Sequence, residues 1–336
     1  MYYHRILRDD FARLFMEGGE LRWMVDHVRE YEDLDFQVRR NAQGQWVSIY
    51  RGGNVITNIL RTRTAGEVTL DAHQTYKDIS PDLAGTRPAS TVKVDPIERI
   101  RQSLEDRDKK DSSHGNNKEG FYQNHLSRRY GVCGEADSEF VIVDREAVVG
   151  HSDEMERQAV LGTIQQEYLE LKRKLLAYGA DGRYGRAAET DGNEVDFIAV
   201  DRQGNILLIE LKRGSADESE IFFLPFQIGV YYEIWSSPGL QQELRKSIPA
   251  MIRQKQAMGL LPNKWEVPEL SGRIIPVAVV AEPVFGNPGL EKLPEVLAFC
   301  RKEKGPDFLK DLRLLSYTID EGLAELPLED YTPIRG

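Results

Sequence analysis

Cysteine is scarce in this chain: Cys133 and Cys300 are the only two among 336 residues. Two cysteines so far apart form neither a disulfide framework nor the closely spaced ligand pairs of a zinc finger. The six histidines include no pair three or four residues apart, so the helical zinc motif of metalloproteases is absent. A phosphate loop with Gly-Lys-Ser or Gly-Lys-Thr is absent too, so we expect no internal ATPase. This cysteine usage predicts a protein of the reducing cytoplasm.

Long apolar runs and an excess of basic charge are also lacking. The longest apolar run, residues 274–281, falls far short of the roughly 18–20 residues that cross a bilayer. The first ten residues lack the apolar stretch of a signal peptide, so we expect no membrane partner. The formal net charge of -11 is not that of a protein that coats nucleic acid. A nuclease stays compatible with it, because metal ions neutralise catalytic acids and local basic clusters contact phosphates.

The length of the chain suggests about two domains as a prior. Residues 1–95 mix a helical apolar pattern with short β-rich runs, which predicts a smaller α+β domain. Residues 96–135 are predicted to connect the domains through a short helix and a mobile polar linker. Residues 106–120 of this segment contain no aliphatic or aromatic side chain. Residues 136–325 alternate strands and helices, with a first strand expected at 183–189, and this order predicts an α/β domain with a mixed sheet.

Two apolar strands joined by a tight turn are predicted over residues 194–212, and they carry charge where buried strands seldom do. Asp196 begins the first strand, and Glu210 and Lys212 end the second. Charges at the end of a central strand are costly unless they are paired or bound to metal. The cluster therefore predicts either a site for a divalent metal beside a cation or a structural group of ion pairs at a sheet edge.

The turn between these strands decides which residues meet. A three-residue loop with Gly204 in the left-handed conformation pairs Asp201 with Asn205. Asp196 then falls directly opposite Glu210, with Cβ atoms roughly 4.5–5.5 Å apart. A two-residue turn would place Glu210 on the other face of the sheet, because strand side chains alternate. We therefore predict the three-residue loop.

These residues resemble a known nuclease family. Gly-Asn-Glu-Val-Asp, followed after thirteen residues by Glu-Leu-Lys and preceded by a glutamate-containing helix, resembles the PD-(D/E)xK nuclease superfamily. Val195 stands where the family name has proline. Gln227 and Tyr231 match the QxxxY motif of the RecB-like branch, and the stretch from Val195 to Gly214 is most similar to NucS-type endonucleases. The resemblance covers about residues 150–320 and implies a restriction-endonuclease-like mixed β-sheet flanked by helices.

The resemblance implies a metal site and a role for each of its residues. Asp196 and Glu210, with the backbone carbonyl of Leu211, would bind Mg²⁺ or Mn²⁺ through the hard oxygen ligands that these ions prefer. The ion would activate water and polarise the scissile phosphate. Lys212 would orient or deprotonate that water and offset charge in the transition state.

The same resemblance implies a helix acid, which is Glu167 or Glu170 on the helix predicted over residues 153–178. A turn of 100° per residue puts Glu167 at the edge of the apolar stripe and Glu170 toward solvent, so we choose Glu167. Gln227 and Tyr231 are four residues apart and share one helix face. They would position the catalytic lysine or contact the substrate backbone; the alternative is a packed tyrosine beside a capping glutamine.

The function that these expectations favour is a metal-dependent nuclease acting on single-stranded, duplex or branched DNA. Arg183, Arg186 and Arg213 are candidate phosphate contacts. The N-terminal domain would select substrate, form a homodimer or bind a protein partner, and the family implies DNA repair or phage defence. One alternative is a non-catalytic module that binds nucleic acid or a partner on a decayed nuclease fold. Another is a nuclease held inactive until the N-terminal domain senses a ligand.

Overall fold

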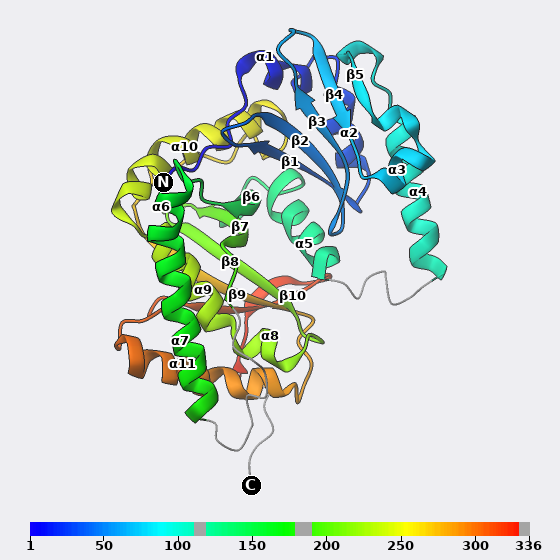
Figure 1. Cartoon of the computed structure of the whole chain (residues 1–336). Helices are drawn as coiled ribbons and strands as arrows, with labels where there is room; N and C mark the ends of the chain where they lie inside the picture. Colours follow the sequence, from blue (N-terminus) through cyan, green and yellow to red (C-terminus); the bar gives the residue numbers. More distant parts are fainter. Residues whose placement is uncertain (111–118, 179–189, 329–336) are drawn as a thin grey trace.

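A computed structural model describes residues 1–110, 119–178 and 190–328, and it contains two β-sheets with helices against them (Figure 1). The predicted arginines Arg183 and Arg186, and the strand expected at 183–189, lie outside the described residues. Within the described ranges, no helix is long and apolar enough to span a bilayer.

The first sheet is antiparallel and has the strand order β1-β2-β3-β4-β5. Its strands are β1 (Leu34–Arg40), β2 (Gln45–Arg51), β3 (Asn54–Arg61), β4 (Glu67–Asp71) and β5 (Gly85–Pro88). The helices of this region are α1 (Asp9–Ala12), α2 (Arg22–Glu30), α3 (Gln74–Ile79) and α4 (Asp95–Lys110), with short turns η1 (Arg13–Phe15), η2 (Pro81–Leu83) and η3 (Ala89–Thr91). Apolar residues of the sheet and of α2 and α4 share one core. This confirms a mixed helix-and-strand N-terminal part.

The second sheet is mixed and has the strand order β11-β10-β9-β8-β7-β6. Its strands are β6 (Phe140–Val148), β7 (Glu194–Asp201), β8 (Ile206–Arg213), β9 (Ile274–Ala281), β10 (Arg313–Thr318) and β11 (Gly322–Glu325). β6, β7 and β8 pair antiparallel, whereas β8, β9 and β10 run parallel. β6 is the first strand of this sheet in the chain.

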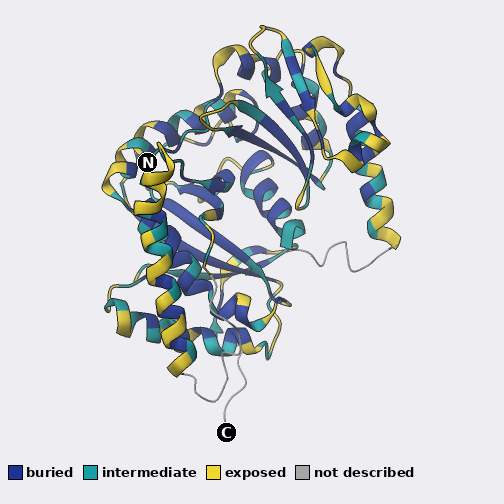
Figure 2. Cartoon of the chain, in the orientation of Figure 1, coloured by how far each residue is buried: buried dark blue, intermediate teal, exposed yellow. Residues whose placement is uncertain are grey.

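Helices bury both faces of the second sheet. The helices of this region are α5 (Glu119–Ser127), α6 (Glu154–Arg157), α7 (Thr163–Tyr178), α8 (Glu218–Phe222), α9 (Leu224–Trp235), α10 (Pro238–Ala257) and α11 (Pro288–Lys304), with the π-helical segments η4 (Arg128–Val132) and η5 (Gln158–Gly162). Ile206 and Leu208 of β8 pack with α7 and α9, whereas Leu207 and Ile209 pack with α5 on the other face. Because both faces are covered, these strands are continuous apolar runs, and Figure 2 shows them buried.

The described parts of the segment predicted as a polar linker, residues 106–110 and 119–120, are helical. Residues 106–110 extend α4, and Glu119 and Gly120 begin α5. The end of α4 buries no apolar side chain but has ion pairs instead, between Lys109 and Glu105 and between Asp108 and Arg51. The linker prediction is therefore wrong for residues 106–110 and 119–120, whereas residues 111–118 lie outside the described residues. The α4 core residues also place this helix with the first sheet, and not with a connecting segment.

Helix α5 lies between the two sheets, in contact with β1 and β2 of the first and β8 of the second (Figure 1). The N-terminal segment also joins the two parts. Leu7 exchanges two hydrogen bonds with the side chain of Gln254 on α10, both 2.8 Å long. Tyr2 pairs with Gly150 beyond the end of β6. The sheets are therefore held together by buried contacts as well as by the chain.

Candidate active site

The β7–β8 hairpin has the predicted register. Phe197 lies opposite Ile209, and Val200 lies opposite Ile206. Gly204 adopts a φ of 76°, the left-handed conformation that the three-residue loop requires. A Cβ at this position would also stand 1.9 Å from the carbonyl oxygen of Glu269, so close packing reinforces the need for glycine.

Asp201 closes the loop, and Asp196 lies one residue beyond Phe197, the last paired residue of β7 at the other end. The amide of Asp201 donates to the carbonyl of Asn205 at 3.1 Å, as predicted, and its Oδ1 accepts from the amide of Asn205 at 2.8 Å. At the other end, Asp196 Oδ2 accepts from the amide of Leu211 at 2.8 Å. Asp196 thus reaches across to the strand end that carries Glu210.

Four charged side chains meet where β7 begins and β8 ends. Lys212 Nζ lies 2.8 Å from Glu210 Oε1 and 3.6 Å from Glu119 Oε1, the latter from the first residue of α5. Glu210 is 1% exposed. Its Oε2 is buried and has no hydrogen-bond partner among the described residues. With Asp196, the site has three carboxylates around one ammonium group.

Burial and mutual repulsion perturb these groups strongly. Burial, then the charge of Asp196, raises the pKa of Glu210 well above its usual range. Burial also raises the pKa of Asp196, against the attraction of Lys212, and raises that of Glu119 to about 7. Burial opposes the charge of Lys212, but attraction by Glu210 and Asp196 outweighs it and raises the lysine pKa. The lysine is therefore held protonated, and the excess of buried carboxylates favours a bound cation.

Gln227 and Tyr231 lie on α9, which packs on the strand that carries Glu210. Gln227 Nε2 donates to the Tyr231 hydroxyl at 2.9 Å. Burial, then the negative charge of Glu210, raises the pKa of Tyr231. The structure therefore brings both members of the motif toward the acids.

Glu167 is not brought to this cluster. Its side chain is 57% exposed, and its Oε1 accepts from Lys304 Nζ on α11 at 2.7 Å. Glu170 is exposed as well and accepts from Gln166. The buried face of α7 is formed by Tyr168, Leu171, Lys172 and Leu175, and Glu167 lies off that face, where it pairs with Lys304 of α11.

Sequence reasoning missed the two residues that α5 places here, Glu119 and Gln123. Gln123 Nε2 donates to Asp196 Oδ1 at 2.7 Å. Their spacing of four, which puts both on one helix face, was a usable signal, but the polar run before them hid the start of the helix. A further buried pair, Lys172 with Asp191 at 2.6 Å, adjoins the site. Burial raises the pKa of Asp191, and the charges of Lys172 and Lys212 oppose that rise.

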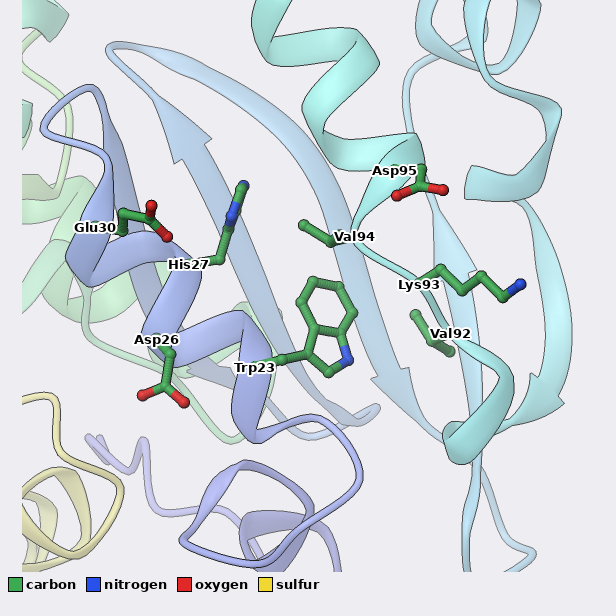
Figure 3. Close-up of a pocket in the computed structure, with 8 residues that line it drawn as sticks. All are labelled: Trp23, Asp26, His27, Glu30, Val92, Lys93, Val94 and Asp95. Carbon is green, nitrogen blue, oxygen red and sulfur yellow. The ribbon is translucent and has the colours of Figure 1, made fainter.

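Cavities lie beside the site and far from it. One of about 320 Å³ is lined by Glu194 of β7, two residues before Asp196, and by Arg39, Arg40 and Trp46 of the first sheet. Arg213 ends β8 directly after Lys212 and is half-buried. A separate groove of about 540 Å³ lies between α2 and residues 92–95, where the Trp23 ring faces Val94 and carboxylates stand around it (Figure 3). This groove contains none of the hairpin acids.

Oxygen donors are available for a divalent metal ion. No group of three or more His, Cys, Asp and Glu side chains in the described ranges is arranged as a metal site. Asp196, Glu210 and the Leu211 carbonyl form a smaller donor set, of the kind that Mg²⁺ completes with water. The unpartnered buried Oε2 of Glu210 fits such an ion, because an orphan carboxylate oxygen is otherwise costly.

The chain matches no protein-family model, no curated protein and no solved structure.

Proposed function

We propose that this protein is a metal-dependent nuclease that hydrolyses phosphodiester bonds, most readily in DNA, on a restriction-endonuclease-like fold. The observation that carries the proposal is the meeting of Asp196, Glu210 and Lys212 at adjoining strand ends, with one Glu210 oxygen buried and unpartnered. A buried carboxylate oxygen without a partner is costly, and a bound cation would stabilise it.

Asp196, Glu210 and the Leu211 carbonyl would hold Mg²⁺ or Mn²⁺, which when bound lowers the pKa of water and polarises a phosphate. Lys212 is held protonated by the surrounding carboxylates, so it offsets negative charge on the phosphate in the transition state and does not take the proton. Glu119 forms a second ion pair with the ammonium group of Lys212. Gln227 and Tyr231 would bind the substrate backbone or orient Lys212.

The cavity beside Glu194 supports a nucleic-acid substrate. Arg40 donates to the carbonyl of Ile6 and forms no carboxylate pair within the described structure, so its guanidinium can contact phosphate. Trp46 lines the same cavity and offers a face on which a base can stack. A local basic and aromatic surface of this kind can bind DNA on a chain whose net charge is negative.

Cleavage of single-stranded, duplex and branched DNA with Mg²⁺ or Mn²⁺ tests the proposal. Glu210→Ala and Lys212→Ala should each lower kcat by about 100-fold or more, the loss typical of one essential charge-stabilising group. Cleavage unchanged by both substitutions would rule out the site.

Substitutions at two glutamates test which helix supplies an acid to the site, α5 through Glu119 or α7 through Glu167. Glu119→Gln should reduce cleavage strongly, because its carboxylate contacts Lys212. Glu167→Gln should leave cleavage as it is, because that side chain binds Lys304 at the surface. The reverse order of effects would contradict the placement of α5 at the site.

A non-catalytic module that binds DNA or a partner is the second candidate. Among the described residues, no group of three or more His, Cys, Asp and Glu side chains is arranged to hold a metal ion, and this favours it. DNA binding without cleavage under every metal condition, together with no Mn²⁺ binding to the wild-type protein, would support this alternative.

A further inference from the structure

Gln123 connects the acid Asp196 to a buried arginine. Its Nε2 donates to Asp196 Oδ1 at 2.7 Å, and its Oε1 accepts from Arg145 Nη2 at 3.1 Å. Gln123 is 9% exposed and Arg145 is fully buried. Both ends of the Gln123 amide are therefore committed within the protein.

Arg145 determines which way that amide points. A guanidinium group has donors and no acceptor, so the glutamine oxygen must face Arg145 and the glutamine N–H groups must face Asp196. Asp196 Oδ2 is meanwhile held by the Leu211 amide at 2.8 Å. Each oxygen of Asp196 thus accepts one fixed hydrogen bond and retains a lone pair for another partner.

Besides an ion pair with its neighbour Glu146 at 3.8 Å, the Arg145 side chain contacts the first sheet. Nη1 donates to Asp35 Oδ2 of β1 at 3.3 Å, and Nη2 donates to the Gly52 carbonyl, in the β2–β3 turn, at 2.9 Å. The guanidinium carbon also lies 4.8 Å from the ring centroid of Tyr50 on β2. Three separate groups of the N-terminal sheet therefore fix the arginine that orients Gln123.

The same turn fixes the helix on which Gln123 stands. A Cβ at Gly120 would be 2.3 Å from the backbone nitrogen of Gly53, so the first turn of α5 abuts the β2–β3 turn backbone to backbone. Glu119 and Gln123 flank this contact on α5. The position of both side chains in the site therefore depends on the N-terminal sheet.

We propose that Gln123 is a positioning residue for Asp196, and that the N-terminal sheet sets its position through Asp35, Arg145 and the Gly120 contact. The N-terminal region is then part of the active site and is more than an accessory module. The expected loss of kcat rests on the proposed nuclease function, whereas the expected loss of Mn²⁺ affinity is measured without any cleavage.

Gln123→Met in the full-length protein tests the inference, because methionine keeps the length of the side chain and removes both hydrogen bonds. Loss of a group that orients a metal ligand typically costs about 10- to 100-fold in metal affinity or activity. We expect that loss in Mn²⁺ affinity, measured without DNA, and in kcat, with the KM for DNA unchanged. Gln166→Met, at an exposed position of α7, is the matched control and should behave as wild type.

Asp35→Asn tests the long-range part without touching α5. It should weaken Mn²⁺ binding in the same direction as Gln123→Met but less. The double variant should be no worse than Gln123→Met alone, since Asp35 reaches Asp196 only through Arg145 and Gln123. Gly120→Ala should weaken Mn²⁺ binding by moving α5 off the turn, and it keeps the test valid if Gln123→Met fails to fold.

Two outcomes separate this inference from the proposed function. Wild-type Mn²⁺ affinity and kcat in folded Gln123→Met, with cleavage abolished by Glu210→Ala, would overturn the positioning role and leave the nuclease standing. Full cleavage by Glu210→Ala would instead overturn the nuclease site, and weaker Mn²⁺ binding by Gln123→Met would then still support the link to Asp196.

Discussion

Lys212 is the residue whose removal should most clearly reveal the charge balance of the site. Its Nζ lies 2.8 Å from Glu210 and 3.6 Å from Glu119, and its side chain is 12% exposed. Lys212→Met keeps much of the volume and removes the ammonium group, which leaves the carboxylates facing one another. The variant should lose cleavage and also stability.

The size of the stability loss follows from burial. Removing one partner of a buried ion pair lowers the free energy of unfolding by about 3–5 kcal/mol, because an uncompensated charge stays behind. The partial exposure of Lys212 places the expectation near the lower end of that range. A metal ion can replace the missing charge, and a ligand at one hundred times its dissociation constant adds about 2.7 kcal/mol. The ion stabilises the wild type as well. It should recover part of the loss in Lys212→Met because it binds this variant more tightly, once no ammonium group competes for the carboxylates.

Urea unfolding with EDTA and with Mn²⁺ measures both effects. Lys310→Met is the matched control, because Lys310 and its partner Asp307 are 63% and 85% exposed and such pairs contribute about 0–1 kcal/mol. In EDTA we expect Lys212→Met to be much less stable than Lys310→Met. With Mn²⁺ the difference between Lys212→Met and wild type should shrink.

Two results would refute this reasoning about Lys212. Equal unfolding midpoints for Lys212→Met and Lys310→Met would show that the buried pair contributes no more than a surface pair. A difference from wild type that is the same in EDTA and in Mn²⁺ would show that the ion does not share the carboxylates with Lys212.

Two further predictions concern the hairpin and the thiols. Gly204→Ala should lower the free energy of unfolding by at least about 1–2 kcal/mol, because a left-handed φ costs this much and the new Cβ would also meet the Glu269 carbonyl. The control Gly44→Ala, in open space, should change the free energy of unfolding by less than about 0.5 kcal/mol. Equal urea midpoints for the two variants would contradict this. Burial raises the pKa of Cys300 to about 12, so a thiol reagent at pH 8 should label exposed Cys133 in the native protein and Cys300 only after unfolding; equal labelling rates would show that Cys300 is accessible.

The hairpin illustrates what could be predicted from local sequence. Loop length and a glycine that tolerates positive φ fix strand register, so the three-residue loop and the pairing around it were predicted correctly. Alternation along β8 likewise predicted that Glu210 and Lys212 share a face, and their side chains lie 2.8 Å apart. The order of strands and helices after residue 194 was also close to the predicted one, because apolar periodicity is strong there.

The helix acid shows where local sequence was insufficient. Helical periodicity gives the buried face of α7, but it cannot say which element lies across the edge of that face. Helix α11 packs beside α7 and places Lys304 next to Glu167, so the two side chains form an ion pair at the surface. The polar composition of residues 106–120 predicted a linker. Instead, α4 extends to residue 110, where its side chains form ion pairs, and α5 begins at Glu119.

The sequence by itself determined the hairpin, the two acids and the lysine at its open end, because neighbours along two joined strands are fixed by local geometry. Only the tertiary structure decided what surrounds them. Glu119 and Gln123 come from a helix held between two sheets, and Arg145 reaches Asp35 across 110 residues of chain. Contacts between segments so distant in sequence depend on how whole elements pack, and no local pattern specifies that packing.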